Sequence, residues 1–210
     1  MLIRSENAAK SSTQPCAATL RWILEHATVQ SALDLGCGKL RYSIALAQVC
    51  KRLTLVDSSV QLTRRQRIHA DYATILDFAR ERLPNARVVP LECFAASRGR
   101  YDLILCANVL SAIPCPRARA AILRSVRDKL TSRGECLFVT QYTNSYFGKM
   151  SQQESSVRHL DGWILTTQRG NFYYGIINKP KLVSLLKRFG YVVSASWVEG
   201  QSAFAVGTRP

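Results

Sequence analysis

The residues best suited to chemistry lie in one short stretch, Asp34-Leu-Gly36-Cys-Gly38. The apolar residues 32–35 predict a buried strand, and residues 40–48 behind the glycines have the apolar spacing of a helix. A strand that runs through a glycine-rich turn into a helix directs free backbone N–H groups at one point. Glycine also leaves no Cβ in the way of an approaching ligand. The stretch therefore predicts a ligand site at the end of the first strand.

Two classes of cofactor use this geometry. Dinucleotide-binding proteins carry G-x-G-x-x-G, in which the third glycine lets the helix pack tightly on the strand. Arg41 stands at that third position, which weakens the dinucleotide interpretation. An acid two residues before the first glycine resembles motif I of the class I S-adenosylmethionine-dependent methyltransferases. An ordinary strand, turn and helix with incidental glycines is the remaining alternative.

Two further acids follow the next predicted strands, at residues 52–57 and 86–91. Asp57 ends the second strand, where a carboxylate in a doubly wound fold can accept both ribose hydroxyls. The third strand leads into Glu92-Cys93-Phe94. The resemblance implies that Glu92 takes the exocyclic amine of adenine and that the backbone N–H of Cys93 or Phe94 meets a ring nitrogen. The structural alternatives are a helix cap formed at Asp57 and its following serines, and an exposed loop acid at Glu92.

Residues 101–114 predict the fourth strand and its exit, which resemble the family's motif IV. We expect Asp102 to be structural, whereas Asn108 and Val109 lie at the carboxyl end, where doubly wound folds place chemistry. The predicted cofactor-binding residues are Asp34, Leu35, Gly36, Cys37, Gly38, Asp57, Ser58, Glu92, Cys93, Phe94, Asn108 and Val109.

The order of these elements predicts an α/β fold: a three-layer sandwich whose doubly wound, mostly parallel sheet has seven strands and an antiparallel C-terminal hairpin. Helices are predicted over residues 15–26, 40–48, 60–68, 72–83, 116–130 and 178–190, and a fifth strand over residues 134–142. We expect a single methyltransferase domain over residues 1–210, with a polar arm at 1–14. Residues 143–175 form an aromatic-rich insertion in which 162–167 and 171–175 predict a hairpin. The resemblance implies that this insertion forms the acceptor side of the pocket; a packed β-excursion is the alternative.

The chain is strongly basic, with a formal net charge of +15 over 210 residues. Such a charge favours anionic partners, and the arginine clusters are read either as a nucleic-acid footprint or as solvated helix faces. Of these arginines, only Arg117 and Arg119, at a helix start, are placed to reach an acceptor.

The chain carries no apolar run of membrane-spanning length, and its first 15 residues lack the apolar core of a signal peptide. Its seven cysteines form no C-x-x-C pair. We therefore predict a cytoplasmic protein with reduced thiols, no metal site and no membrane partner.

The resemblance implies an enzyme that transfers a methyl group from S-adenosylmethionine by in-line displacement. The residues of the motif IV segment and the aromatic insertion favour a small-molecule acceptor, whereas the positive charge favours RNA or DNA. A non-catalytic cofactor-binding or adaptor module is the third hypothesis. Candidates for orienting the acceptor or accepting its proton are Tyr142, Asn144, Tyr146 and His159.

Overall fold

The structure is a computed structural model that describes residues 3–142, 148–149, 151–168 and 170–210. The chain divides into two compact units. Residues 9–105 and 128–135 make up the N-terminal unit, and residues 1–8, 106–127 and 136–210 make up the C-terminal unit.

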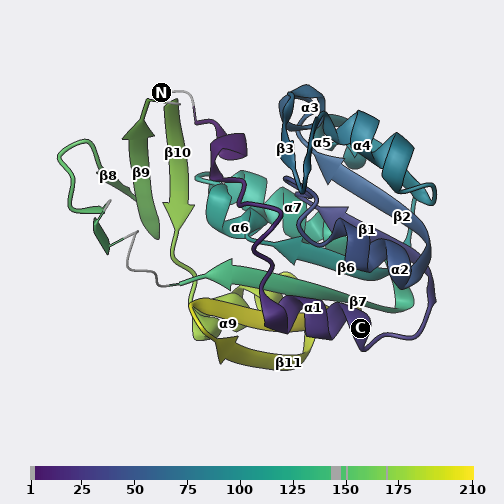
Figure 1. Cartoon of the computed structure of the whole chain (residues 1–210). Helices are drawn as coiled ribbons and strands as arrows, with labels where there is room; N and C mark the ends of the chain where they lie inside the picture. The colour runs from purple at the N-terminus through teal and green to yellow at the C-terminus, as the bar shows by residue number, and fades with distance from the viewer. Residues whose placement is uncertain (1–2, 143–147, 150, 169) are drawn as a thin grey trace. The chain divides into compact units, whose positions relative to one another are not determined.

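The N-terminal unit is built on parallel strands (Figure 1). β1 (Val29–Leu35) pairs with β2 (Cys50–Asp57), and β2 pairs with β5 (Ala86–Pro90). The register sets Leu35 beside Val56 and Asp57 beside Pro90, so the ends of all three strands meet at one edge. β1 is buried along most of its length, as expected for a parallel strand covered on both faces. The remaining elements that begin in this unit are α1 (Ala17–Leu24), α2 (Ser43–Gln48), α3 (Ser59–Thr63), β3 (Gln66–Ile68), β4 (Asp71–Ala73), α4 (Ile75–Arg82), α5 (Leu91–Phe94) and β6 (Tyr101–Ala107).

The C-terminal unit contains an antiparallel hairpin, β11 (Val192–Glu199) and β12 (Ser202–Thr208), with α9 (Lys179–Arg188) packed against both strands. The Asn178 side chain caps α9 by accepting the Lys181 N–H at 3.1 Å, and Gly190 follows the helix at φ +77°. A second sheet is formed by β8 (Val157–His159), β9 (Gly162–Thr167) and β10 (Gly170–Gly175), which confirms the predicted hairpin. The other elements are η1 (Ser5–Ala8), α6 (Val109–Ala112), α7 (Pro116–Lys129) and β7 (Leu130–Gln141), the last two contributing residues to both units.

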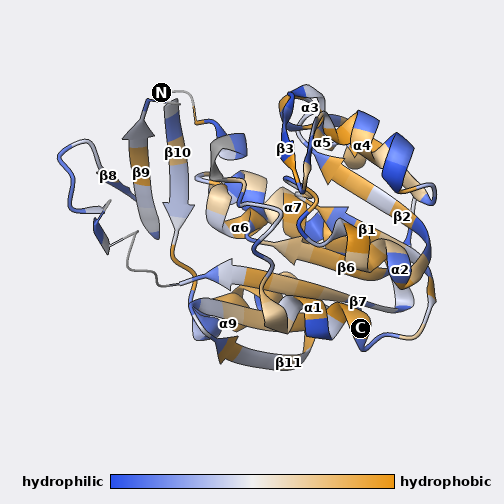
Figure 2. Cartoon of the chain, viewed as in Figure 1, coloured by the Kyte–Doolittle hydropathy of each residue, from blue (hydrophilic) through white to orange (hydrophobic). Residues whose placement is uncertain are grey.

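The strands of the main sheet are hydrogen-bonded in the order β11-β12-β7-β6-β1-β2-β5. This order confirms the predicted α/β fold, with seven strands in a mostly parallel, doubly wound sheet that ends in an antiparallel hairpin. The order reverses at β1, whose neighbours are β2 and β6, and such reversals are where open α/β sheets bind ligands. Figure 2 shows β6 and much of β2 in the orange of apolar residues, whereas β10 is pale to blue.

The predicted helices over residues 60–68 and 72–83 are wrong in part. α3 ends at Thr63 because Arg64 is extended, and β3 and β4 then pair as an antiparallel hairpin. Gln66 and Ile68 are buried while Arg67 between them is exposed, which is the two-residue period of a strand. The second helix begins later than predicted, at Ile75, because Thr74 caps it by accepting the Asp77 N–H.

Two other boundaries differ from the prediction. α2 begins at Ser43 rather than at residue 40, because Leu40 has the left-handed φ of +59° and cannot continue a helix. α7 ends at Lys129, and β7 starts at Leu130, ahead of the predicted start at Gly134. Gly134 therefore lies inside a strand, where an added Cβ would come within 2.6 Å of the Tyr101 carbonyl oxygen.

Asp34, the acid ahead of the glycine turn, is buried within the N-terminal unit. Its Oδ2 accepts a hydrogen bond of 2.6 Å from Ser43 Oγ at the first residue of α2, which ties the strand to the helix that follows it. Burial raises the pKa of Asp34 to about 7; the Ser43 hydrogen bond opposes this shift, and the negative charge of Asp57 adds to it.

We expect an Asp34→Asn variant to gain stability relative to the natural chain as the pH rises. The pKa of Asp34 in the folded chain lies above the value of about 3.9 for an unperturbed aspartate. Proton binding to Asp34 therefore stabilises the fold fully below about pH 4. This stabilisation is lost as the pH rises through about 7. Asparagine keeps an acceptor for Ser43 and does not ionise. Urea unfolding at about pH 5 and about pH 8 measures the difference in unfolding free energy between the two proteins. The matched control is Glu81→Gln on the exposed face of α4. A difference that is equal at both pH values would contradict the prediction.

Candidate functional site

The turn after β1 is fastened to β2 through its own backbone. The N–H groups of Gly36 and Cys37 both donate to the Val56 carbonyl oxygen, at 2.8 and 3.1 Å, and the Gly38 N–H donates to Asp57 Oδ2 at 2.8 Å. The expectation that this turn offers free N–H groups is therefore wrong for these three residues. Gly36 and Gly38 have φ values of +72° and +58°, which favour glycine. The turn thus contributes its shape and a close approach to the main chain rather than unpaired donors.

The other predicted residues in the glycine turn have buried side chains. The side chains of Asp34, Leu35 and Cys37 are all buried, and burial is the main cause that raises the pKa of the Cys37 thiol. A ligand at this edge can therefore meet these residues only through their backbone.

Asp57 joins the turn to the next helix. One carboxylate oxygen accepts the Gly38 N–H, and the other accepts the Ser58 N–H at 2.8 Å. Ser58 in turn caps α3, because its Oγ accepts the Gln61 N–H at 3.2 Å. The Gln61 side-chain amide donates back to the Gly38 carbonyl oxygen. A carboxylate has about four acceptor positions, so one such group can hold several donors at once.

Glu92 lies beyond the end of β5 and reaches the start of α3. Its carboxylate accepts the Ser59 hydroxyl at 3.0 Å and the Ser59 N–H at 3.3 Å. The pKa of Glu92 is lowered, first by a hydrogen bond from its own backbone and further by the bonds from Ser59. Asp57, Ser58 and Glu92 therefore lie together at one edge of the N-terminal unit, as the sequence predicted.

Cys93 and Phe94 lie in the one-turn helix α5 rather than in the predicted loop. Cys93 is exposed, whereas Phe94 is almost fully buried under Lys129, whose Nζ lies 4.9 Å from the ring centroid. Burial of the apolar Phe94 ring is favourable, and the helical turn of α5 is the conformation in which this ring is buried. The predicted contact uses a backbone N–H, so it stays a prediction for Cys93 or Phe94 whatever the burial of the Phe94 ring.

Asn108 and Val109 belong to the C-terminal unit, where Asn108 precedes α6 in the left-handed conformation, φ +63°. Its N–H donates to the Val139 carbonyl oxygen at 2.7 Å. Within the part of the chain that the structure describes, the buried Asn108 Oδ1 has no hydrogen-bond partner. The buried Ser111 Oγ, in α6 itself, has none either. Buried polar atoms are seldom left unsatisfied, so these two acceptors mark α6 as a place where a bound molecule could donate.

The four candidates for acting on the acceptor fall in or near the insertion. Asn144 and Tyr146 lie outside the described residues. Tyr142 is half-buried and its N–H donates to the Gln201 carbonyl oxygen at 3.2 Å. His159 is half-buried, with Nε2 2.9 Å from the Pro114 carbonyl oxygen and its ring edge-on to Tyr173. Since a carbonyl oxygen can only accept, Nε2 carries the proton in this contact.

Arg119, which the sequence places within reach of an acceptor, has its guanidinium bonded to other groups of the chain. Its guanidinium makes two bonds to the Asp161 carboxylate, at 2.6 and 2.8 Å, and a third to the Ile113 carbonyl oxygen. Tyr173 and Lys181 also donate to Asp161, and these partners hold the pKa of Asp161 well below its usual range despite its burial. This cluster could not be found from sequence, because its members are joined only through the folded chain.

No group of three or more His, Cys, Asp or Glu side chains that could hold a metal ion occurs among the described residues. Nor does any helix in those same stretches have both the length and the apolar character needed to cross a membrane. All seven cysteines are free thiols.

Comparisons with known proteins agree with this geometry. The family model of a methyltransferase domain matches residues 8–196. The chain is 38% identical over 202 residues to the uncharacterized protein YmfD of Escherichia coli K12, covering 96% of this chain and 90% of that one. It is 28% identical over 135 residues to a ubiquinone biosynthesis O-methyltransferase of Psychrobacter arcticus; this match covers 63% of this chain and about half of that protein, 49%.

Solved structures share the fold. A DhpI–SAH complex matches with a TM-score of 0.66 at 19% identity, over 91% of this chain and 82% of that one. The 1,6-didemethyltoxoflavin-N1-methyltransferase of Burkholderia thailandensis matches with a TM-score of 0.63 at 16% identity, over 96% and 80%. The match of the family model over most of the chain, together with this strand order, leads to one conclusion: the chain belongs to the methyltransferase domain family and has the class I fold.

Proposed function

We propose that this chain is an S-adenosylmethionine-dependent methyltransferase that acts on a small-molecule acceptor. The cofactor would bind where β1, β2 and β5 end, over the glycine turn and beside Asp57. The main support for this site is the Asp57 carboxylate, which accepts a 2.8 Å hydrogen bond from the Gly38 N–H of the turn. An acid at the end of the second strand is the group that holds a ribose in doubly wound folds.

The residues at this edge fit an adenosyl cofactor. Gly38 supports a close approach because it has no Cβ, and its φ of +58° favours glycine. The Asp57 carboxylate is the kind of acceptor that ribose hydroxyls need, and Glu92 is an exposed acceptor at the next strand end. The structural relative DhpI supports this choice of cofactor, because it was solved in complex with SAH and with SAM.

In methyl transfer, the main task of the protein is to position the two reactants. S-adenosylmethionine supplies an electrophilic methyl group on a sulfonium sulfur, which is a good leaving group. The protein then has to bind the acceptor and align its nucleophilic atom in line with that bond, and alignment alone can contribute most of the rate. A residue that removes a proton is needed only if the acceptor atom is protonated at neutral pH. Tyr142, Asn144, Tyr146 and His159 remain our candidates for these tasks.

The small-molecule class of acceptor is supported by relatives named for such substrates, including the ubiquinone biosynthesis O-methyltransferase and the didemethyltoxoflavin N1-methyltransferase. We also propose a cytoplasmic location, which the seven free thiols support.

A nucleic-acid acceptor is the second candidate, favoured by the net charge of +15. Several arginines have internal partners, however. Arg119 is bound to Asp161, Arg100 donates to the carbonyl oxygens of Asp128 and Leu130, and Arg127 donates to that of Phe189. These three guanidinium groups are engaged in holding the fold, and that of Arg119 is neutralised by a carboxylate, which supports the small-molecule alternative.

We expect Asp57→Ala to weaken the binding of S-adenosylhomocysteine at least about tenfold, because each hydrogen bond to a charged group contributes about 1.5–3 kcal/mol. Asp57→Asn, which keeps one acceptor oxygen, should fall between this variant and the natural chain. Titration calorimetry measures the affinity, and urea unfolding checks that the turn survives the loss of the Gly38 contact. The matched control is Asp71→Asn in β4, whose carboxylate is partly exposed and pairs with Arg82 at 3.7 Å. Unchanged affinity in Asp57→Ala would mean that the ribose-binding acid is misassigned.

Binding to RNA and DNA is expected to be weak, independent of sequence and lost at moderate salt, because surface arginines act by displacing condensed counterions. Fluorescence anisotropy with RNA and DNA oligonucleotides across a salt series measures this. In parallel, labelled cofactor and cell extract are incubated with the protein, and the label is separated into RNA, DNA, protein and small molecules. Label in RNA or DNA, or a complex that persists at high salt, would promote the nucleic-acid alternative. Tight cofactor binding with no label in any fraction would instead favour a non-catalytic module.

A further inference from the structure

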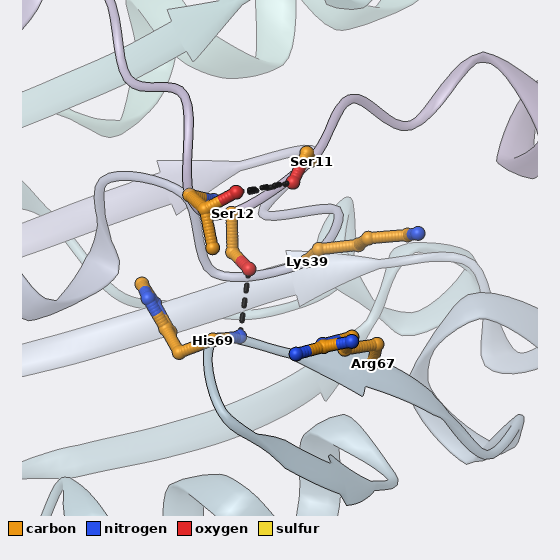
Figure 3. A pocket seen from close by; sticks show the side chains of 6 residues that line it. Ser11, Ser12, Lys39, Arg67 and His69 are labelled. Atoms are coloured by element: carbon orange, nitrogen blue, oxygen red, sulfur yellow. Dashed lines mark hydrogen bonds between the residues drawn. The ribbon is translucent and has the colours of Figure 1, made fainter.

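A cavity of about 330 Å³ lies within the N-terminal unit, outside the contacts described so far. It is lined by Ser11, Ser12, Thr13, Lys39, Arg67 and His69. The lining residues come from three parts of the chain: the segment before α1, the glycine turn, and the β3–β4 hairpin; Figure 3 labels five of them. Its volume lies at the lower end of the range for small-molecule sites, about 300–1,000 Å³.

The walls of this cavity are held by hydrogen bonds. Ser12 is buried and its Oγ accepts the His69 N–H at 2.7 Å, while the hydroxyls of Ser11 and Thr13 are bonded to each other at 2.9 Å. The His69 ring is held by Nε2, 3.2 Å from the Leu40 carbonyl oxygen, and stacks on Phe78 with 5.9 Å between the ring centroids. His69 itself takes the left-handed conformation, φ +51°, a strained position for a residue other than glycine. Arg41, two residues after Lys39, donates to the Gln14 carbonyl oxygen and secures the segment that carries the serines.

The lining has the chemistry of an anion site. Lys39 and Arg67 bring positive charge, Ser12 and one of the bonded pair Ser11 and Thr13 keep a hydroxyl proton to donate, and the cavity is lined by no carboxylate among the described residues. Positively charged side chains that line one cavity attract an anion, and hydroxyl groups beside them can add hydrogen bonds to its oxygens. Lys39 also follows directly on Gly38, so the cavity adjoins the turn where we place the cofactor.

We propose that this cavity binds an oxyanion, a phosphate or carboxylate group that the acceptor carries. The binding of an oxyanion stands on the cavity alone, whereas its assignment to the acceptor rests on the proposed function. The acceptor is then an anionic small molecule, held by its charged group in the N-terminal unit.

The first experiment uses inorganic phosphate as the probe and needs no cofactor. Phosphate is titrated into the natural chain, Lys39→Gln and Arg67→Gln, with binding followed by calorimetry or phosphorus NMR. Each substitution is expected to weaken phosphate binding at least about fivefold, because each removes one charged donor. The matched control is Arg80→Gln on α4, whose side chain is 79% exposed and which does not line the cavity. Phosphate that fails to bind the natural chain, or that binds all four proteins alike, would overturn the proposal.

The second experiment separates the acceptor from the cofactor as the source of the anion. S-adenosylhomocysteine is titrated into the same four proteins, and the small-molecule fraction of the labelling assay is split by anion exchange. We expect Lys39→Gln and Arg67→Gln to keep the natural affinity for S-adenosylhomocysteine within about twofold, and the label to appear in the retained, anionic fraction. A loss of affinity for S-adenosylhomocysteine that parallels the loss of phosphate binding would assign the cavity to the cofactor's own carboxylate and overturn the acceptor assignment. Label in neutral or cationic molecules would do the same. A natural chain that binds phosphate but not S-adenosylhomocysteine would contradict the proposed function while supporting the oxyanion site.

Discussion

The Asp57 carboxylate is the contact on which the candidate site depends. With one oxygen on the Gly38 N–H and the other on the Ser58 N–H, it joins the turn after β1 to the start of α3. Ser59 then carries the connection to Glu92 beyond β5. Three strand ends that are adjacent in the sheet are thereby linked by charge-assisted hydrogen bonds at their polar edge.

The same arrangement explains why the acids at this edge differ in role. Asp34 is buried and bonded to Ser43, and its negative charge would lie in an apolar surrounding, so its pKa rises to about 7. Glu92 is exposed, bonded to donors, and its pKa falls. A side chain that remains charged and reachable is suited to hold a polar ligand, whereas a buried one that retains its proton is suited to hold a strand to a helix. The position in the fold, rather than the residue type, separates the two tasks.

The sequence predicted much of the N-terminal unit because its signals are local. A strand, two glycines and a helix follow one another within a few residues, and Asp57 and Glu92 end strands that are readable from their apolar runs. Local signals were also sufficient for α9, whose cap and terminal glycine are both in the sequence. They failed at β3 and β4, where residues compatible with a helix are drawn into a hairpin by the burial of Gln66 and Ile68. They also failed for Arg119, whose partner is distant in the chain, and for the lining of the cavity, which comes from three separate segments. Such contacts exist only after folding, and no spacing in the sequence encodes them.

The Arg119–Asp161 cluster has a consequence for how this protein can change over evolutionary time. Both side chains of the pair are almost fully withdrawn from water, at 10% and 7% exposure, and Tyr173 and Lys181 share the same carboxylate. Losing Asp161 leaves the buried Arg119 charge without this carboxylate, at a cost of about 3–5 kcal/mol, whereas replacing both residues by apolar ones can be nearly neutral. Selection therefore links the two positions, and lineages that lack Asp161 should also lack Arg119. Covariation at these two positions would trace which relatives keep the sheet of β8, β9 and β10 attached in this way.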